Sequence, residues 1–345
     1  MDPINMKLVS LATDFPSQSF TQIECLEEMR KAPFWRNLKD RSKLILEKVL
    51  ESDSSIKKRH FQVDDISEVW GRSAEELNKH YELSAPSIGA NAIKKAIIAA
   101  NIDPHDIDVL LVSSCTGYLC PGISSYVAQN LGCRNNIHTQ DVTGHGCGAA
   151  IPLTQIAHGY SKLMPSACIV TLSVEVCSAA FYISDEPDVL ISTCLFGDGA
   201  AAAVWSSDSG DYEVYGYESF LNPKEREKIR FVNSGGKLKN QLHRSVPEMT
   251  AKAVKKLYDN SETPKKIITH GGGRDVIDAL EKKLGITEMV ETRNVLANYG
   301  NLSSPSVMVA LDEYLKNDGN DDEIWLSSFG AGFSAHSMKL KKTTL

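Results

Sequence analysis

Residues Ile107–Cys115 read IDVLLVSSC, and this nearly unbroken apolar run predicts a buried β-strand. The next pattern, GISSYVAQNLG over Gly122–Gly132, has helical periodicity and stops at a glycine. Further apolar runs at Ala167–Glu175 and Ala200–Ser207 predict two more strands. Because buried strands alternate here with helices, the sequence predicts an α/β fold with largely buried sheets.

The second part of the chain repeats this theme. KKIITHGGG (Lys265–Gly273) predicts a strand that runs into a glycine turn, and Arg274–Gly285 predicts an amphipathic helix with a glycine C-cap. Residues Glu323–Leu340 predict two final strands around a glycine-rich bend. In each half a glycine-rich loop leads into a helix that opens on small residues, at Gly144–Ala150 and at Gly300–Ser306. This shared layout indicates an internal duplication.

A polar stretch at 206–212, SSDSGDY, predicts the boundary between the two halves. We therefore expect an N-terminal half over residues 1–207 and a C-terminal half over residues 208–345.

The composition indicates a globular protein that does not bind nucleic acid. The 345 residues are 42% hydrophobic and 23% charged, and the net charge of -7 gives no basic excess to neutralise phosphates. No apolar run reaches the roughly 18 residues of a membrane-spanning helix, so we expect no membrane span. The N-terminus has no signal-peptide pattern, which favours a cytoplasmic location with the eight cysteines as reduced thiols. No pair of cysteines or histidines has zinc-ligand spacing, so no metal is expected.

The stretch DVTGHGCGAAIP (Asp141–Pro152) contains the first candidate catalytic residue. Cys147 stands between two glycines and directly before a small-residue helix. The N-terminus of that helix would lower a thiol pKa and bind an oxyanion. By itself, a cysteine in apolar surroundings is more often an inert structural thiol.

Two further glycine-rich loops carry a histidine and an asparagine. His270 ends a predicted strand, where ligand-binding crevices of α/β sheets lie, but a structural turn histidine fits equally well. Asn301 follows Gly300 at a predicted helix start, where helix capping is its ordinary role. A Cys–His–Asn set on three glycine-lined loops shifts the interpretation towards catalysis.

These motifs resemble those of the chalcone synthase-like type III polyketide synthases of the thiolase superfamily and, more distantly, ketoacyl-ACP synthase III. The similarity runs from about Ser55 to the C-terminus. It rests on IKKRHF, LLVSSCTGYLCPG, GHGCGAA, CLFGDGAAAAV, VPEMTAKAV, THGGG, NYGNLSSPSV and SFGAGFS. The resemblance implies a five-layered αβαβα fold built from two duplicated βαβαβαββ-type halves. It also implies a cytoplasmic homodimer.

The resemblance implies decarboxylative Claisen condensation, with Cys147, His270 and Asn301 as the catalytic residues. An acyl thioester would load Cys147, whose thiolate an imidazolium at His270 would hold. His270 and Asn301 would stabilise the enolate left when a malonyl-type extender loses CO₂. No tightly bound cofactor is expected, and the substrates would be acyl-CoA or acyl-carrier-protein thioesters.

The resemblance also implies a substrate pocket in which several family residues are changed. Of the two family gatekeeper phenylalanines, Phe196 is present and Asn240 replaces the other. Phe231 falls near a cavity-shaping glycine, and Ala331 replaces a proline. These changes favour few extensions over many. The full set of pocket residues implied is Thr116, Cys120, Phe196, Asn240, Ser303, Gly332 and Phe333.

The sequence does not decide whether the group that carries the acyl thioester is coenzyme A or an acyl carrier protein. The family's basic positions for coenzyme A phosphates fall on Leu46, Val49 and Asp53, although Lys43, Lys48, Lys57 and Lys58 lie nearby. A basic run could instead dock an acidic acyl carrier protein, and a solvated charged face is its plainer explanation. The run comprises Lys224, Arg226, Lys228, Arg230, Lys237, Lys239 and Arg244.

Three other functions are alternatives to a condensing enzyme that adds one or a few extender units. The first is a ketoacyl-ACP synthase III-like single-step ketosynthase or acyltransferase, and the second is a catalytically silent subunit that only pairs with an active one. The third is an α/β-hydrolase. Its nucleophile elbow needs glycines two residues before and after the nucleophile, where this chain has His145 and Ala149, so the elbow is absent. We expect Glu175 to form buried structural hydrogen bonds and Asp198 to form a turn. His145 has no assigned role.

Overall fold

A computed structural model describes residues 5–51, 55–261 and 264–343. Its strands form two sheet layers that meet along β1 and β8, where only Lys7↔Glu213 and Leu8↔Tyr212 pair. The layer from the first half contains β1 (Lys7–Asp14), β7 (Gly199–Ser206), β6 (Cys168–Glu175), β4 (Ile107–Ser113) and β5 (His138–Val142), in that order. The layer from the second half contains β8 (Tyr212–Leu221), β13 (Ser334–Lys342), β12 (Glu323–Gly330) and β11 (Lys266–Thr269).

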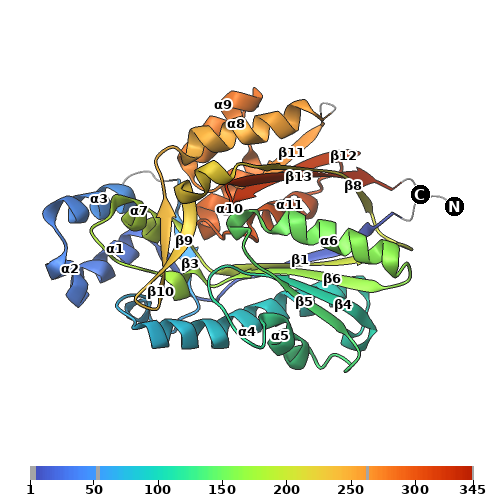
Figure 1. Ribbon diagram of the computed structural model, residues 1–345, viewed down its shortest axis with the longest axis horizontal. Coiled ribbons are helices and arrows are strands. Elements are labelled where there is room, and N and C mark those ends of the chain that lie inside the picture. The colour runs from blue at the N-terminus through green and yellow to red at the C-terminus, as the bar shows by residue number, and fades with distance from the viewer. Residues whose placement is uncertain (1–4, 52–54, 262–263, 344–345) are drawn as a thin grey trace.

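Helices cover both outer faces of the sheets and fill the space between them, which gives the five expected layers (Figure 1). One outer layer contains α4 (Ala74–Ala100) and α5 (Ile123–Leu131). The middle layer contains α6 (Ala150–Leu163) and α11 (Ser306–Lys316). The other outer layer contains α8 (Val246–Asp259) and α9 (Arg274–Leu284).

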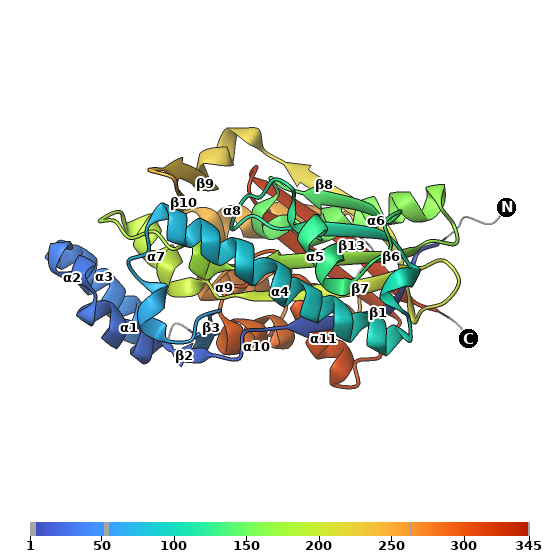
Figure 2. The same ribbon diagram turned by 90° about the horizontal axis from the view of Figure 1, so that it is seen from below.

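The remaining elements gather mainly at the end of the molecule away from both termini (Figures 1 and 2). The helices among them are α1 (Gln22–Lys31), α2 (Pro33–Asn37), α3 (Asp40–Glu51), α7 (Pro187–Leu195) and α10 (Val290–Tyr299). Two small antiparallel pairs complete the fold: β2 (Ser19–Thr21) with β3 (Lys58–His60), and β9 (Ile229–Ser234) with β10 (Lys237–Leu242). None of the described helices is long and apolar enough to cross a membrane.

The two halves share a pairing pattern. In the first half β4 and β6 are parallel, while β6 pairs antiparallel with β7, and β7 with β1. In the second half β11 and β12 are parallel, while β12 pairs antiparallel with β13, and β13 with β8. The predicted duplication of layout is therefore present in the strand pairing. The division at 207/208 falls between β7 and β8, and the independence of the halves as domains stays a prediction.

The second half departs from the expected βαβαβαββ pattern by one strand. Among its described residues β5 has no counterpart, because the segment before the Asn301 loop forms the helix α10. That loop pairs instead through a single bridge between Asn301 and Phe196.

The middle layer explains why the core strands read as nearly continuous apolar runs. Helices α6 and α11 lie between the two sheets, and residues such as Leu153 and Val307 are buried against both. A second apolar cluster lies between α4 and the first sheet, and a third lies under α8 and α9. Strands that are covered on both faces need apolar side chains at successive positions.

Candidate active site

Cys147, His270 and Asn301 line one cavity of about 390 Å³. Cys147 lies in a short 3₁₀ turn, Gly146–Gly148, between β5 and α6. His270 follows β11, and Asn301 precedes α11. The two halves therefore contribute residues to the same space, and three loops that are far apart in the sequence meet there.

The Cys147 loop is packed against the bend that follows β12. A Cβ added to Gly330 would lie 2.3 Å from the His145 carbonyl oxygen and 2.5 Å from the Gly148 nitrogen. Only glycine fits this close approach of two backbones. The Ser328 hydroxyl donates to the Gly148 carbonyl at 2.9 Å. The end of β12, in the second half, thus fixes the loop of the first half beside the cavity.

Cys147 is 9% exposed, and burial raises the pKa of its thiol to about 12. The Ser303 hydroxyl donates to Cys147 Sγ at 3.2 Å and lowers this pKa, while the nearby Glu175 carboxylate raises it. The described hydrogen-bond partner of the thiol is therefore Ser303 and not His270. Burial thus favours the neutral thiol over the thiolate.

His270 is 1% exposed, and burial lowers its pKa to about 3. Its backbone N–H donates to the Ser327 carbonyl at 2.9 Å, and its ring packs 4.8 Å from that of Phe329. Within the described residues neither ring nitrogen has a hydrogen-bond partner. Since His270 lines the cavity, both nitrogens are within reach of a substrate group that binds there. Burial opposes the imidazolium that the resemblance implies.

Asn301 does not cap α11, so the capping interpretation is wrong; the N-cap position belongs to Pro305. Its side chain donates to the Gly272 carbonyl at 2.8 Å and accepts from the Ser303 backbone N–H at 2.8 Å. Its backbone N–H donates to the Leu195 carbonyl at 2.8 Å. The amide is therefore held in one orientation, with its second N–H not used by these bonds.

Gly300 allows the backbone before Asn301 to pass close to the Leu195 carbonyl. Its φ is +72°, and an added Cβ would lie 2.6 Å from the Leu195 carbonyl oxygen. Gly300→Ala should therefore destabilise the fold by roughly 2–6 kcal/mol, from backbone strain and overpacking together. Gly285 is a matched control, because it has the same φ of +72° at a helix C-cap with open space around it. Gly285→Ala should cost only about 1–2 kcal/mol. Equal losses in denaturant unfolding would contradict the expected clash.

Arg59 is a buried positioning residue that the sequence interpretation did not single out. Its Nη1 donates to the carbonyls of Phe196 at 3.0 Å and Thr193 at 2.8 Å, and its Nε donates to Gln22 at 2.9 Å. These bonds hold the strand-like segment that pairs with Asn301. The motif IKKRHF contains Arg59, but its neighbours Lys57, Lys58 and His60 are also polar, so the sequence did not mark Arg59 as the buried one.

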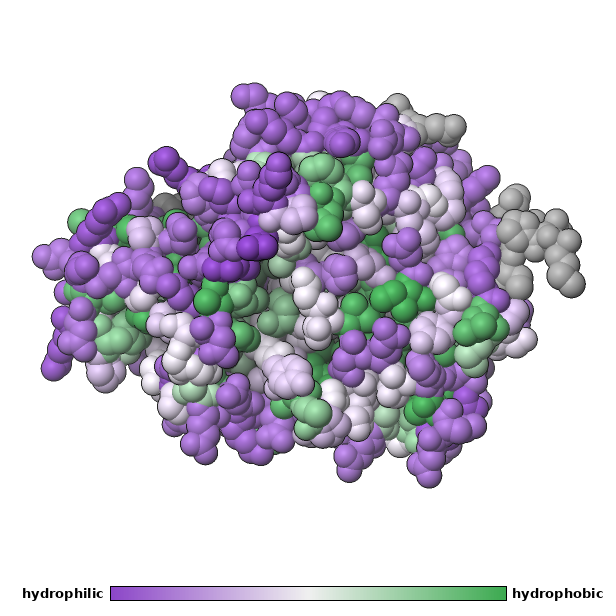
Figure 3. Space-filling model, viewed as in Figure 1, coloured by the Kyte–Doolittle hydropathy of each residue, from purple (hydrophilic) through white to green (hydrophobic). Residues whose placement is uncertain are grey.

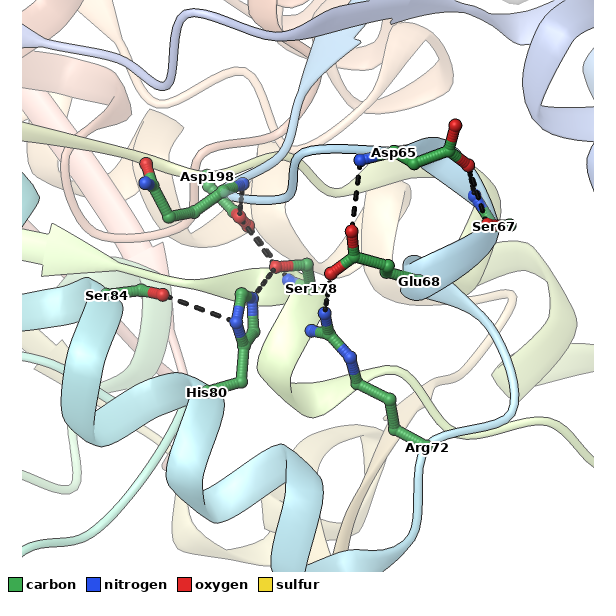
Figure 4. A network of polar contacts seen from close by, with 9 residues as sticks. Asp65, Ser67, Glu68, Arg72, His80, Ser84, Ser178 and Asp198 are labelled. Atoms are coloured by element: carbon green, nitrogen blue, oxygen red, sulfur yellow. Dashed lines mark hydrogen bonds and ion pairs between the residues drawn. The ribbon is translucent and has the colours of Figure 1, made fainter.

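Asp198 binds two segments that neighbour its own (Figure 4). Its carboxylate accepts from the Ser178 backbone N–H at 2.8 Å, from the Ser178 hydroxyl at 2.6 Å and from the Gln62 N–H at 2.9 Å. His80 contacts the same hydroxyl at 2.9 Å. Burial raises the pKa of Asp198 to about 6. The turn predicted at Asp198 is absent, because the residue lies in the extended segment between the Phe196 bridge and β7.

Glu175 forms the buried structural hydrogen bonds expected of it. One carboxylate oxygen, Oε2, accepts from Ser114, Cys115 and Thr116, and Oε1 accepts from the Ser304 hydroxyl at 2.6 Å. The buried carboxylate therefore ties the loop after β4 to the Asn301 loop. It does not line the cavity.

Of the seven pocket residues expected from the resemblance, Phe196 lines the cavity and Ser303 contacts the Cys147 thiol. The other five lie away from the cavity lining. Thr116 is buried and its hydroxyl donates to Glu175, while Cys120 is exposed. Asn240 lies on β10 and pairs with Phe231 on β9. Gly332 lies in the bend after β12, and Phe333 is buried in the apolar cluster under α8. Cavity walls that sequence reasoning missed are Ile191, Leu195, Ile229, Leu242, Val276 and Phe329.

Basic and acidic side chains line the cavity beside this apolar wall. They include Lys48, Arg244 and Arg274, together with Asp188 and Asp275. Of the positions compared with coenzyme A-binding residues, Val49 also lines the cavity, Leu46 is buried, and Asp53 lies outside the described residues.

Much of the basic run expected to dock a carrier protein is engaged within the chain. Arg226 and Arg230 pair with Glu227, Lys239 pairs with Glu186, and Lys237 donates to the Arg72 carbonyl. The face in Figure 3 is largely hydrophilic, with hydrophobic residues in separate small patches. Among the described residues no group of three or more His, Cys, Asp or Glu side chains is arranged to hold a metal.

His145 lies against a second histidine on the far side of the nucleophile loop. Its ring is 5.7 Å from that of His336, in an edge-to-face arrangement. His336 contacts the hydroxyls of Ser219 at 2.9 Å and Ser334 at 3.2 Å. Neither ring lines the cavity, so the contacts of His145 are those of a packing residue.

Comparisons with known proteins agree with this fold and site. The sequence profile of the FAE1/type III polyketide synthase-like proteins matches residues 28–219, more than half of the chain. The profile of the 3-oxoacyl-[acyl-carrier-protein] synthase III C-terminal region matches residues 260–342.

Full-length relatives are similar over nearly the whole chain. The phloroglucinol synthase of Pseudomonas fluorescens is 24% identical over 93% of this chain and 95% of its own. The 1,3,6,8-tetrahydroxynaphthalene synthase of Streptomyces coelicolor is 28% identical over 93% of this chain and 88% of its own.

Solved structures show the same fold. The Streptomyces coelicolor tetrahydroxynaphthalene synthase superposes with a TM-score of 0.87 at 25% identity, covering 98% of this chain and 100% of the other. A polyketide synthase of the brown alga Ectocarpus siliculosus gives a TM-score of 0.89 at 23% identity and 98% coverage of both chains.

The thiolase-like fold and the condensing-enzyme prediction are therefore confirmed, whereas the ketoacyl-ACP synthase III-like alternative does not fit. The chain is an acyl-transferring enzyme that performs decarboxylative Claisen condensation of an acyl thioester with a malonyl-type extender. It belongs to the FAE1/type III polyketide synthase-like family.

Proposed function

We propose that Cys147 is the acyl-accepting nucleophile of this condensation and that His270 and Asn301 act on the extender. The observation that carries the proposal is that these three side chains, from three loops and both halves, line one cavity. Each of them is at most 9% exposed, so the reacting groups are shielded from bulk water. Shielding strengthens every hydrogen bond made to a developing negative charge.

Loading of Cys147 begins from a neutral thiol and a neutral imidazole. Burial disfavours the thiolate and the imidazolium separately, which is why the thiol pKa is about 12 and the His270 pKa about 3. Transfer of the thiol proton to His270 creates no net charge, and the resulting ion pair stabilises both partners. The thiolate then attacks the acyl thioester carbonyl, and the carrier thiol leaves with a proton.

Decarboxylation uses the donors of His270 and Asn301. The extender's thioester carbonyl points towards a ring nitrogen of His270 and the second N–H of Asn301. When the bond to the carboxylate breaks, CO₂ leaves and its electron pair forms the enolate, whose oxygen accepts both hydrogen bonds. Each such donor is typically worth on the order of 10²–10³ in rate.

The condensation step joins the enolate carbon to the acyl carbonyl on Cys147. A carbon–carbon bond forms, the tetrahedral oxyanion collapses, and the Cys147 thiolate leaves. The Cys147 backbone N–H and the bend around Gly332 are the proposed donors to that oxyanion. Support comes from the close packing of Gly330 on this loop, which places the two backbones side by side.

The cavity wall favours an acyl group with an apolar chain. Ile191, Leu195, Phe196 and Leu242 line it, whereas Thr116, Cys120 and Asn240, which the resemblance implies as pocket residues, do not. Because these positions do not line the cavity, we propose few extensions. Coenzyme A is the proposed carrier, and Lys48, Arg244 and Arg274 line the cavity as candidate contacts for its phosphates.

The test is intact-mass spectrometry of the protein after incubation with a panel of acyl-CoA and acyl-carrier-protein thioesters. We expect a mass increment from acyl-CoA donors with apolar chains, and products that contain one or a few added C₂ units only when malonyl-CoA is present. Products of many extensions would contradict the proposed limit. An increment obtained solely from carrier-protein donors would contradict coenzyme A as carrier.

We also propose that the chain forms a homodimer. Support comes from β5, which is an edge strand of the first sheet layer, and from the exposed apolar residues Tyr118 (81%) and Leu163 (75%). Light scattering after size exclusion should give twice the chain mass, and a monomer at micromolar concentration would contradict the proposal.

A further inference from the structure

We propose that Ser303 is a further catalytic residue, a hydrogen-bond donor that stabilises the Cys147 thiolate during loading and again when the thiolate leaves. The proposal rests on Cys147 as the nucleophile and deepens that assignment. The observation behind it is the 3.2 Å contact from the Ser303 hydroxyl to Cys147 Sγ, formed where both groups are buried.

The neighbouring acceptors leave the hydroxyl hydrogen of Ser303 for the sulfur. Ser303 Oγ also lies 3.4 Å from Oε1 of Glu175 and 3.5 Å from Cys115 Sγ. Oε1 already accepts from the Ser304 hydroxyl at 2.6 Å and from the Cys115 thiol at 3.2 Å. Because a hydroxyl has only one hydrogen to donate, the satisfied carboxylate makes Cys147 the favoured acceptor.

The backbone of Ser303 is held in a strained conformation that gives the hydroxyl its direction. Its φ is +59°, a region that residues with a Cβ rarely adopt. The side chain of Asn301 maintains this turn by accepting the Ser303 N–H at 2.8 Å. Strain of this kind persists where the surrounding structure imposes it, and it clusters at functional sites. Asn301 thus also positions the donor to the nucleophile.

The thiolate needs this donor in addition to the imidazolium that forms when His270 accepts the thiol proton, because its other neighbours carry no positive charge. Glu175 on β6 raises the pKa of the thiol, and the half-buried Cys115 after β4 and the buried Cys177 in the turn after β6 lie close to it. His270 lines the same cavity and is neutral until it accepts that proton. Ser303 is the described side chain that donates to the sulfur and lowers its pKa.

The test is the rate of Cys147 alkylation at fixed pH, followed by peptide mass spectrometry. A hydrogen bond to a charged acceptor shifts a thiol pKa by about one unit or more. Ser303→Ala therefore lowers the thiolate fraction about tenfold, which the higher nucleophilicity of the more basic thiolate reduces to a roughly three- to fourfold slower reaction. The exposed Cys120 in the same sample is the internal reference.

Three comparisons separate this role from a merely structural one. Ser306→Ala removes a buried hydroxyl at the start of α11 that bonds to neither Glu175 nor Cys147, so it should leave the Cys147 rate unchanged. Ser303→Gly relieves the backbone strain and should slow alkylation as much as Ser303→Ala. Iodoacetamide and the bulkier N-ethylmaleimide should be slowed equally, because the thiolate fraction is the same for both.

An unchanged rate in both Ser303 variants would overturn the proposal, and so would a loss that grows with reagent size or an equal loss in Ser306→Ala. These readouts do not use condensation. Failure of the nucleophile assignment would appear separately, as absence of an acyl increment on a Cys147 that is still alkylated.

Discussion

Cys147→Ala is expected to abolish the acyl-enzyme mass increment and to lower the condensation rate by roughly 10⁴-fold or more, as loss of a covalent nucleophile does. No other described cysteine lines the cavity, so no neighbouring thiol takes over the acyl group. Intact-mass spectrometry with acyl-CoA measures the first effect, and product formation from malonyl-CoA measures the second. The fold should survive, because alanine fits where a small thiol stood.

Cys194→Ala is the matched control for this substitution. Cys194 is fully buried in the same apolar cluster, and burial raises its thiol pKa to about 12 as for Cys147, but it does not line the cavity. The variant should lose about 1 kcal/mol of stability at most and keep its acyl increment. Full condensation in Cys147→Ala, or loss of loading in Cys194→Ala, would place the nucleophile elsewhere.

His270→Gln is expected to slow CO₂ release from malonyl-CoA by on the order of 10²–10³-fold, because it replaces a donor aimed at the developing enolate. Loading of Cys147 should fall as well, because His270 is the proposed acceptor of the thiol proton, although Ser303 still donates to the sulfur. Labelled CO₂ release measures decarboxylation, and the acyl increment with time measures loading. Between pH 5 and 8 the wild-type rate should show no step from His270 in the free enzyme, because its pKa of about 3 leaves it neutral throughout.

Two further variants serve as comparisons for His270→Gln. His145→Gln alters a half-buried histidine near the same loop that does not line the cavity, so both rates should stay within a few-fold of the wild type. Asn301→Ala should impair loading as well as decarboxylation, because its side chain also holds the Ser303 turn. Loading at the wild-type rate in His270→Gln would contradict the proposed proton transfer from Cys147 to His270.

Local patterns were sufficient to predict the layered architecture. The apolar run Ile107–Cys115 corresponds to β4, and Gly122–Gly132 to α5 with Gly132 in the left-handed C-cap. Such predictions work because a strand covered on both faces and a helix with one buried face each impose their own period. No such periodicity predicted the helix α10, which lies where a third strand of the second half was expected.

The contacts around the nucleophile could not be predicted in the same way. Asn301 has the sequence position of a helix cap, and only the bridge to Phe196 shows that it lies in an extended segment before the helix. The partner of Cys147 is 156 residues away, and its direction depends on a positive φ at a serine. Arg59 likewise acts through carbonyls more than a hundred residues distant. Long-range contacts of this kind leave no periodic signal.

The burial of Cys147 has a consequence for the idle enzyme. Burial raises the pKa of its thiol, so the protonated form is favoured until a thioester lies in the cavity and the proton moves to His270. The desolvation that makes this first proton transfer harder also strengthens the ion pair once it has formed.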